Sequence, residues 1–414
     1  MEVLLEDALT RAGGISSQDR RLVQELVYGC VRWQSALDWL ISRKTGGRTQ
    51  KFFLENLLRL GLYQIFWMDR IPGHAAVNET VESARRNGFS SQAGFVNALL
   101  RGYLRELEPT RQLLADLKRD QPHVGFSQPE WLVERWKARW GGDKTAQLLE
   151  WNNNPPPTFA RVNTLKTDAE KLLAQWRNEA VEYDFFQRDW LEENLVFELK
   201  GHPPLHRLPS FQQGLFYVQD PSTLYSVREM GAQPGENVLD LCAAPGGKLT
   251  SMAQFMKNEG RLLAHDPVPA RMKLLRENCE RLGVTCVTLV PSEMLGSVGP
   301  GSMDRVLIDA PCSNTGVMRR RVDLRWRIRP EEVERLKSTQ LALLAQAAAL
   351  VKAGGVLVYS TCSLEPEENA LLVRHFLSTN PWFRLERERE LLPFEDRVDG
   401  TYVARLEKAG TPNQ

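Results

Sequence analysis

The sequence predicts an α/β protein of three parts, whose last part holds a mostly parallel sheet with helices on both faces. From about residue 211 to 410, short apolar runs rich in β-branched residues alternate with longer stretches of helical spacing, the pattern of strand–helix–strand units. Residues 1–145 show apolar side chains at helical spacing throughout and predict an all-helical domain. Three consecutive prolines at 155–157 then end any helix and stiffen the connection.

In the helical part, two segments show the amphipathic pattern most clearly, Asp19–Arg32 and Phe53–Trp67. Pro72 and Gly73 lie in a loop that leads into a further helix. The apolar faces of these helices need burial in a core whatever the function is. Four arginines are candidate RNA contacts, although a solvated helix face explains each of them equally well: Arg59, Arg85, Arg86 and Arg101.

Residues 146–210 predict a small α+β insert, with strands at 158–163 and 194–199 and a helix over Asp168–Arg177. Residues 211–410 form the α/β domain. Its strands are expected at 236–240, 261–266, 284–290, 304–309 and 354–360, its main helices at 267–282 and 330–351, and a last strand at 400–407.

Composition and length are those of an ordinary globular protein. The 414 residues suit two or three domains, and 42% are hydrophobic and 25% charged. No apolar run approaches the ~20 residues that span a bilayer, and the first residues lack the pattern of a signal peptide. Six cysteines without a C-x-x-C pair predict neither a disulfide framework nor a zinc site. We therefore expect a cytoplasmic monomer that binds no metal and no membrane.

The most informative stretch runs from Asp240 to Lys248 and joins a short apolar strand to a helix over 249–257. Gly246 and Gly247 lack Cβ, so the backbone can bend tightly and approach a ligand closely. The free N–H groups at the helix start favour an anionic or polar ligand group. The spacing fits neither the dinucleotide nor the P-loop pattern, and two adjacent glycines are also common in ordinary strand-to-helix turns.

Two further strands end in polar clusters that contain a cysteine. Asp309 ends one strand and is followed by Cys312, and Cys362 follows the strand at 354–360. Because ligands collect at the carboxyl ends of parallel strands, these two cysteines and Cys242 should lie along one edge, beside the Gly-rich turn. Three cysteines at three strand ends suit a site better than a core.

A basic segment, Arg319–Arg329, follows the Asp309 cluster and contains six arginines, whereas the whole chain has a net charge of only +1. That overall balance is not typical of a nucleic-acid binder, and a solvated basic loop is one explanation of the segment. The planar Trp326 among guanidinium groups beside the expected site favours phosphate contact and base stacking instead.

Three motifs together carry a family resemblance: DLCAAPGGK at 240–248, DAPCS at 309–313 and STCS at 360–363. In this order they resemble RsmB/Sun-type RNA cytosine-C5 methyltransferases, which use S-adenosylmethionine (SAM). The flanking YVQDPS at 217–222 and LEPEEN at 364–369 are similar to the same family. In the first part, LVYG, LRLGLYQ and FVNALLR resemble the NusB family of helical RNA-binding domains, and RVNTLK at 161–166 resembles the opening of the family's small insert.

The resemblance implies a fold and a domain order. The fold is a Rossmann-like class I methyltransferase domain with a mostly parallel seven-stranded sheet, in which a late strand lies antiparallel. It is preceded by an all-α NusB-like domain and a small α+β insert. The implied boundaries are 1–145, 146–210 and 211–410.

The resemblance also implies how SAM is held. The Gly-rich turn should surround the amino-acid end of SAM, and Asp266 should take the ribose hydroxyls. The acidic residue that the family carries after the third strand is missing here. Either Ser292 or Glu293 substitutes for it, or the adenine is held differently. The expected cofactor-binding residues are Cys242, Ala243, Ala244, Pro245, Gly246, Gly247, Lys248, Asp266, Ser292 and Asp309.

Cytosine carbon 5 is a weak nucleophile until a thiolate adds to carbon 6, which explains the need for a cysteine. Asp309 is placed to hold the edge of the base and share a proton. Two cysteines compete for the attack, because Cys312 follows proline as in DNA cytosine-C5 methyltransferases and Cys362 matches the RNA family. Local physics does not decide between them. The surrounding RNA-family motifs favour Cys362, with Cys312 assisting proton removal and release.

The function implied is SAM-dependent methylation of cytosine carbon 5 in RNA, most simply 16S ribosomal RNA. A tRNA cytosine-C5 methyltransferase is the close alternative. A non-catalytic RNA-binding factor with a retained SAM fold is an alternative of another class, against which the two cysteines, Asp309 and the Gly-rich turn argue. A DNA methyltransferase is disfavoured because its target-recognition insert and motif order are absent.

Overall fold

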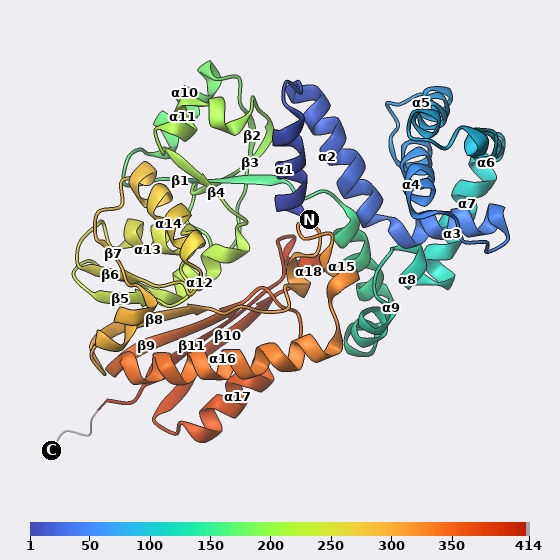
Figure 1. Ribbon diagram of the computed structural model, residues 1–414. Helices are drawn as coiled ribbons and strands as arrows, with labels where there is room; N and C mark the ends of the chain where they lie inside the picture. Colours follow the sequence, from blue (N-terminus) through green and yellow to red (C-terminus); the bar gives the residue numbers. More distant parts are fainter. Residues whose placement is uncertain (411–414) are drawn as a thin grey trace. The chain divides into compact units, whose positions relative to one another are not determined.

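The computed structural model describes residues 1–410, apart from the side chains of residues 2 and 3, as two compact units. One unit comprises Met1–Pro155 together with Met318–Arg327, and the other comprises Pro156–Val317 together with the chain from Ile328 onwards. Figure 1 labels their helices and strands. The Arg319–Arg329 segment therefore belongs mostly to the helical unit and not to the α/β unit from which it emerges.

The first unit is all-helical, as predicted. Its helices are α1 (Glu2–Ala12), α2 (Ser17–Arg32), α3 (Gln34–Thr45), α4 (Phe52–Trp67), α5 (Gly73–Arg86), α6 (Ala93–Arg105), α7 (Leu107–Asp120), α8 (Pro122–Gly125), α9 (Glu130–Asn153) and the short α15 (Leu324–Arg327). The two segments with the clearest helical pattern form α2 and α4. Ser16 caps α2, since its hydroxyl accepts a hydrogen bond from Asp19 N at 3.1 Å. Leu37, Leu58 and Leu62 are completely buried in the core of this unit.

The expectation that the arginine segment contacts RNA is wrong for its central residues. Arg325 is 1% exposed and donates to Arg32 O at 2.9 Å, Asn153 Oδ1 at 2.7 Å and Asn152 O at 3.0 Å. Trp326 donates its indole N–H to Val31 O at 2.8 Å, and the Arg319 guanidinium lies 3.9 Å from the ring centre of Trp151. These hydrogen bonds and the cation–π contact attach the segment to the rest of the helical unit. Within residues 319–329, Arg321, Arg327 and Arg329 are exposed, and Arg327 forms an ion pair with Asp323.

We expect Arg325→Ala to lower the free energy of unfolding of the helical unit by about 3 kcal/mol, because several buried acceptors lose their donor at once. Urea denaturation followed by circular dichroism measures the loss. Arg327→Ala is the matched control, since the Arg327 side chain is 63% exposed in its ion pair with Asp323 and such pairs contribute about 0–1 kcal/mol. Equal losses in the two variants would contradict the structural role of Arg325.

The second unit begins with a small antiparallel sheet, ordered β2-β3-β1-β4. Its elements are β1 (Thr158–Val162), α10 (Ala169–Asn178), β2 (Glu182–Phe185), β3 (Val196–Gly201), α11 (Pro209–Gln212) and β4 (Phe216–Val218). Asp168 caps α10 through a 2.8 Å bond from Lys171 N, and Trp176 packs edge-on against Phe197 and Phe216. The boundaries differ from those expected: residue 145 falls inside α9, and β4 lies beyond residue 210, because it pairs with β1.

The main sheet has seven strands in the order β10-β11-β9-β8-β5-β6-β7, which confirms the predicted Rossmann-like methyltransferase fold. The strands are β5 (Asn237–Asp240), β6 (Arg261–Ala264), β7 (Val287–Leu289), β8 (Met303–Asp309), β9 (Val351–Thr361), β10 (Phe383–Leu391) and β11 (Thr401–Lys408). The five from β9 to β7 are parallel, and β11 is antiparallel to both of its neighbours. The sequence did not predict β10, because this edge strand is mostly charged and lacks the apolar run of the other strands.

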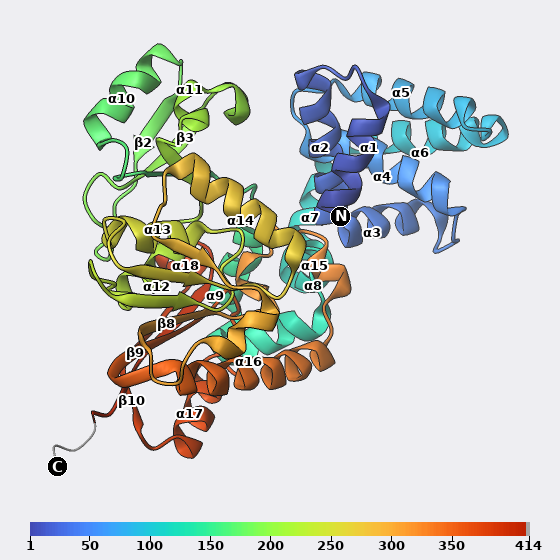
Figure 2. The same cartoon turned by 60° about the vertical axis from the view of Figure 1, so that its left-hand side comes forward.

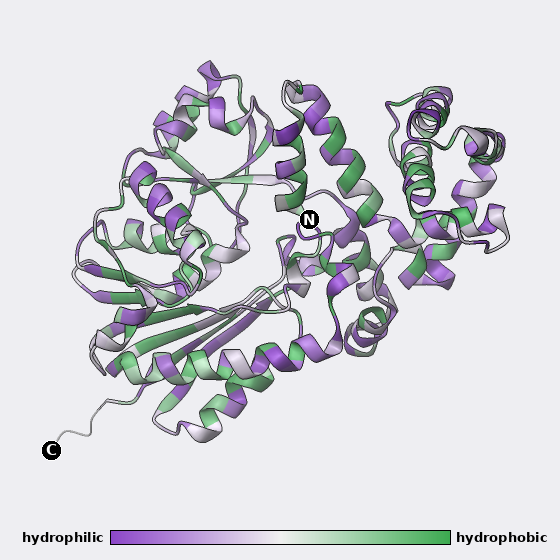
Figure 3. Cartoon of the chain, viewed as in Figure 1, coloured by the Kyte–Doolittle hydropathy of each residue, from purple (hydrophilic) through white to green (hydrophobic). Residues whose placement is uncertain are grey.

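Helices cover both faces of this sheet, as Figures 1 and 2 show. On one face lie α12 (Ser222–Met230), α13 (Gly247–Phe255) and α14 (Pro269–Leu282); on the other lie α16 (Pro330–Leu350) and α17 (Ala370–Thr379). Consecutive residues of β5 point to opposite faces, so Val238 joins the core under α12–α14 and Leu239 joins the core over α16 and α17. The central strands are accordingly hydrophobic along their length (Figure 3).

Candidate active site

Three loops meet at the carboxyl ends of the neighbouring strands β5, β8 and β9. The sulfur atoms of Cys312, after β8, and Cys362, after β9, lie 3.2 Å apart. Lys248, after β5, places its Nζ 2.6 Å from Asp309 Oδ2 at the end of β8. Because these strands are parallel neighbours, side chains from positions 248 to 362 converge at one edge of the sheet, as the sequence analysis expected.

A cavity of about 220 Å³ lies beside this cluster. Its wall includes seven of the ten expected cofactor-binding residues: Cys242, Ala243, Ala244, Pro245, Gly247, Lys248 and Asp309. Five lining residues were not expected: Tyr217, Val218, Gln219, Thr223 and Asp240. Four of these come from the YVQDPS segment and α12, so the flanking motif was the signal that pointed to them.

Gly246 and Gly247 have different structural roles in the turn. Gly246 has φ +108°, and a Cβ there would lie 2.7 Å from Leu275 Cδ1, so this glycine lets the chain turn against the core. A Cβ on Gly247 would lie 3.2 Å from the Tyr217 ring and 3.5 Å from Gln219 Oε1, both of which line the cavity. A side chain at position 247 would therefore meet two residues that line the cavity, whereas Gly246 acts through backbone conformation.

Asp266 and Ser292 lie outside the cavity wall. The buried Asp266 carboxylate accepts from Ala244 N at 3.3 Å and Val268 N at 3.0 Å and pairs with Arg271 at 3.1 Å, so it shapes the Gly-rich turn; its contact with a ribose stays a prediction. Ser292 is exposed in the short helix that follows β7. The contact of Ser292 with the adenine stays a prediction.

Charged side chains face one another in the wall of the cavity. Burial, followed by the neighbouring charge of Asp309, raises the pKa of Asp240 to about 7. For Lys248 burial acts to lower the pKa, but the adjacent Asp309 carboxylate outweighs it and the net pKa is raised. Lys248 is therefore a cation near neutral pH, and its Nζ lies 2.6 Å from Asp309 Oδ2.

The two cysteines differ in exposure and partners. Cys312 is 7% exposed, and its hydrogen bond with Cys362 together with burial raises its pKa well above the usual value. Cys362 is partly exposed, and its sulfur lies 3.2 Å from Asn314 Oδ1. Cys242 lines the cavity, and burial raises its pKa. Access and environment therefore favour Cys362 as the thiol that meets a substrate.

A buried carboxylate that the sequence analysis did not single out fixes both cysteine loops. Glu368 is completely buried and accepts from Ser313 N at 2.8 Å and Gln340 Nε2 at 2.9 Å. The hydroxyls of Ser313 and Ser363, each next to one of the paired cysteines, donate to its other oxygen. The LEPEEN segment contains three glutamates, and only the folded chain reveals which of them turns inward to these serines.

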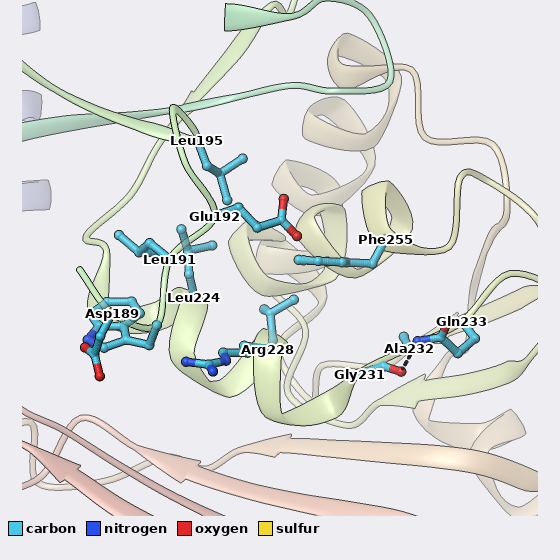
Figure 4. A pocket seen from close by; sticks show the side chains of 12 residues that line it. Asp189, Leu191, Glu192, Leu195, Leu224, Arg228, Gly231, Ala232, Gln233 and Phe255 are labelled. Carbon is cyan, nitrogen blue, oxygen red and sulfur yellow. Dashed lines mark hydrogen bonds between the residues drawn. The ribbon is translucent and has the colours of Figure 1, made fainter. Parts of the chain in front are cut away.

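A larger cavity of about 360 Å³ lies elsewhere in this unit (Figure 4). It is lined mainly by apolar side chains such as Leu191, Leu224 and Phe255, with Glu192 and Arg228 beside them. Gly231 and Ala232, which precede β5, also line it, and neither Cys312 nor Cys362 does. Size alone therefore does not identify the reactive site.

Residues 1–410 contain no helix with the length and apolar composition needed to cross a membrane. In the same part of the chain, no three His, Cys, Asp or Glu side chains are grouped so that they could hold a metal ion.

Comparisons with known proteins cover almost the whole chain. The model described as "16S rRNA methyltransferase RsmB/F" matches residues 228–407, "NusB family" matches 2–105, and "Methyltr_RsmF/B-like, ferredoxin-like domain" matches 128–198. "Probable ribosomal RNA small subunit methyltransferase B" of Bacillus subtilis (strain 168) is 34% identical, covering 98% of this chain and 94% of that protein. "Ribosomal RNA small subunit methyltransferase B" of Klebsiella pneumoniae is 34% identical, covering 95% of this chain and 91% of that protein. The solved structure "Crystal Structure of PH0851" matches with a TM-score of 0.79 and 26% identity. The match covers 97% of this chain and 93% of that one.

Proposed function

The chain belongs to the RsmB family of ribosomal RNA small subunit methyltransferases, and we propose on this premise that it methylates carbon 5 of a cytosine in 16S ribosomal RNA through a covalent cysteine adduct. It is an RNA methyltransferase of SAM-dependent fold. The observation that carries the cytosine-C5 chemistry is the pair of thiols 3.2 Å apart. Methyl transfer to an oxygen or an exocyclic nitrogen needs no thiol nucleophile, whereas addition to carbon 6 does.

The residues of the 220 Å³ cavity fit SAM. The first N–H groups of α13 and the Gly247 backbone suit a carboxylate, and the absent Cβ of Gly247 leaves the ligand room. The acidic side chains Asp240 and Asp309 suit the positively charged ammonium and sulfonium groups. When bound, SAM would supply an electrophilic methyl group.

In the proposed mechanism, the Cys362 thiolate forms a bond to carbon 6 of the cytosine, and the electron pair of the 5,6 double bond makes carbon 5 nucleophilic. Asp309, held by Lys248 at 2.6 Å, accepts a hydrogen bond from the N3/N4 edge and shares a proton with it. Carbon 5 would take the methyl group while the bond between that group and the cofactor sulfur breaks, which leaves S-adenosylhomocysteine. Cys312 then assists removal of the carbon 5 proton by accepting it on its sulfur as a thiolate. The electrons of that C–H bond restore the double bond, and the Cys362 sulfur leaves.

Bisulfite sequencing of total RNA from a deletion strain and its parent tests the proposal. One cytosine of 16S ribosomal RNA is expected to lose its protection from conversion in the deletion strain and to regain it when the wild-type gene is returned. A lost site in tRNA instead would identify the tRNA-modifying alternative. Unchanged protection everywhere would support the non-catalytic RNA-binding alternative and reject the proposal.

We expect Gly247→Val to weaken binding of S-adenosylhomocysteine, the demethylated cofactor, by about tenfold or more, because the added side chain is directed at Tyr217 and Gln219 across the cavity. Isothermal titration calorimetry measures the affinity. Gly94→Ala serves as the control, since an added Cβ there meets nothing within 4 Å. Undiminished affinity in a folded Gly247→Val protein would show that the cofactor is bound elsewhere.

A further inference from the structure

Arg161 on β1 is a buried cation without a carboxylate partner. It is 1% exposed, and its Nη1 donates to Gln219 Oε1 and Gly247 O at 2.7 Å each, while Nη2 donates to Thr250 Oγ1 at 3.0 Å. Its Nε atom has no hydrogen-bond partner. Among residues 1–410, no acidic side chain lies within 4.0 Å of its guanidinium group. All its acceptors are neutral.

A buried charge of this kind is costly unless something compensates it. Burial lowers the pKa of Arg161 to about 9, and the nearby cation Arg281 adds to the effect. The group nevertheless remains charged at neutral pH. An uncharged donor would be sufficient for structural bonding alone. Asn163, the residue that follows β1, is an example: its amide donates to Gly214 O at 2.7 Å and Leu282 O at 2.8 Å.

The charge lies directly behind one wall of the candidate cofactor cavity. Two of its hydrogen-bond partners, Gln219 and Gly247, line that cavity, and so does Tyr217, whose ring centre is 5.5 Å from the guanidinium carbon. Gly247 is also the first residue of α13, so the positive end of the helix dipole and the guanidinium act on the same corner of the cavity. An anionic ligand group at this corner would compensate both.

We propose that Arg161 is an electrostatic positioning residue for the cofactor, whose charge recognises the α-carboxylate of SAM through the cavity wall. The inference rests on the proposed assignment of this cavity to SAM. Through Arg161, the small antiparallel sheet contributes to the choice of cofactor. Arg161 thereby favours ligands that carry the amino-acid end over nucleosides that lack it.

Calorimetry with two ligands tests this on the full-length protein. S-adenosylhomocysteine carries the α-carboxylate, and 5′-methylthioadenosine lacks the whole amino-acid end. Arg161→Met is expected to weaken the first by about tenfold or more and to change the second by less than about twofold. Arg161→Lys should restore most of the preference. Asn163→Ala, which removes uncharged hydrogen bonds made just after the same strand, should leave the ratio of the two affinities unchanged.

A second variant covers the case in which Arg161→Met does not fold. Thr250→Asp offers Arg161 a counter-charge from outside the cavity wall and should lower the affinity for S-adenosylhomocysteine selectively. Equal losses for both ligands, or no loss for either, would overturn the inference while leaving the proposed function intact. If the wild-type protein binds neither ligand, the assignment of the cavity to SAM is itself wrong.

Discussion

Cys362→Ala is expected to abolish methyl transfer, with a loss of at least about 1,000-fold in rate, because the variant has no sulfur in the position that attacks carbon 6. The covalent protein–RNA adduct should disappear with it. The structural basis is the partial exposure of Cys362 beside the buried Cys312. Transfer of a tritiated methyl group from SAM to unmodified 16S ribosomal RNA measures the rate.

Cys286→Ala is the matched control, because Cys286 is a partly exposed cysteine that precedes β7, away from the thiol pair. Its activity should equal that of the wild type. If Cys362→Ala keeps its activity, the covalent mechanism is wrong for this protein.

Cys312→Ala is expected to trap the enzyme on its product. The Cys362 sulfur can still attack and the methyl group can still be transferred, but removal of the carbon 5 proton loses its helper 3.2 Å away. Release then becomes slow, and an adduct that resists denaturant should accumulate to a large fraction of the enzyme. Denaturing gels of protein incubated with RNA and SAM measure it.

The two variants read together decide which cysteine attacks. An adduct that persists in Cys362→Ala and vanishes in Cys312→Ala would reverse the roles and indicate the arrangement of DNA cytosine-C5 methyltransferases. The double variant should form no adduct and transfer no methyl group, and it provides the background for both measurements.

The local sequence was sufficient to predict the strands and the turn that carry the site residues. The strand–turn–helix around the Gly-rich turn and the two strands that end in cysteines are each encoded within about ten consecutive residues, by apolar β-branched runs that end in small or polar side chains. Parallel strands bring their carboxyl ends to one edge, so the position of Cys312, Cys362 and Asp309 beside the Gly-rich turn followed from the pattern. The seven-stranded fold came from the family resemblance.

Only the tertiary structure decided what the charged and polar residues do. Arg325 and Arg161 are arginines that no local pattern distinguishes from exposed ones, yet each is buried on acceptors far away in the chain, from Arg32 to Asn153 and from Gln219 to Thr250. Glu368 likewise differs from its neighbouring glutamates only through the two serines that it meets. Burial of a charge depends on whether distant parts of the chain bring enough donors or acceptors to it, and that is a property of the folded molecule alone.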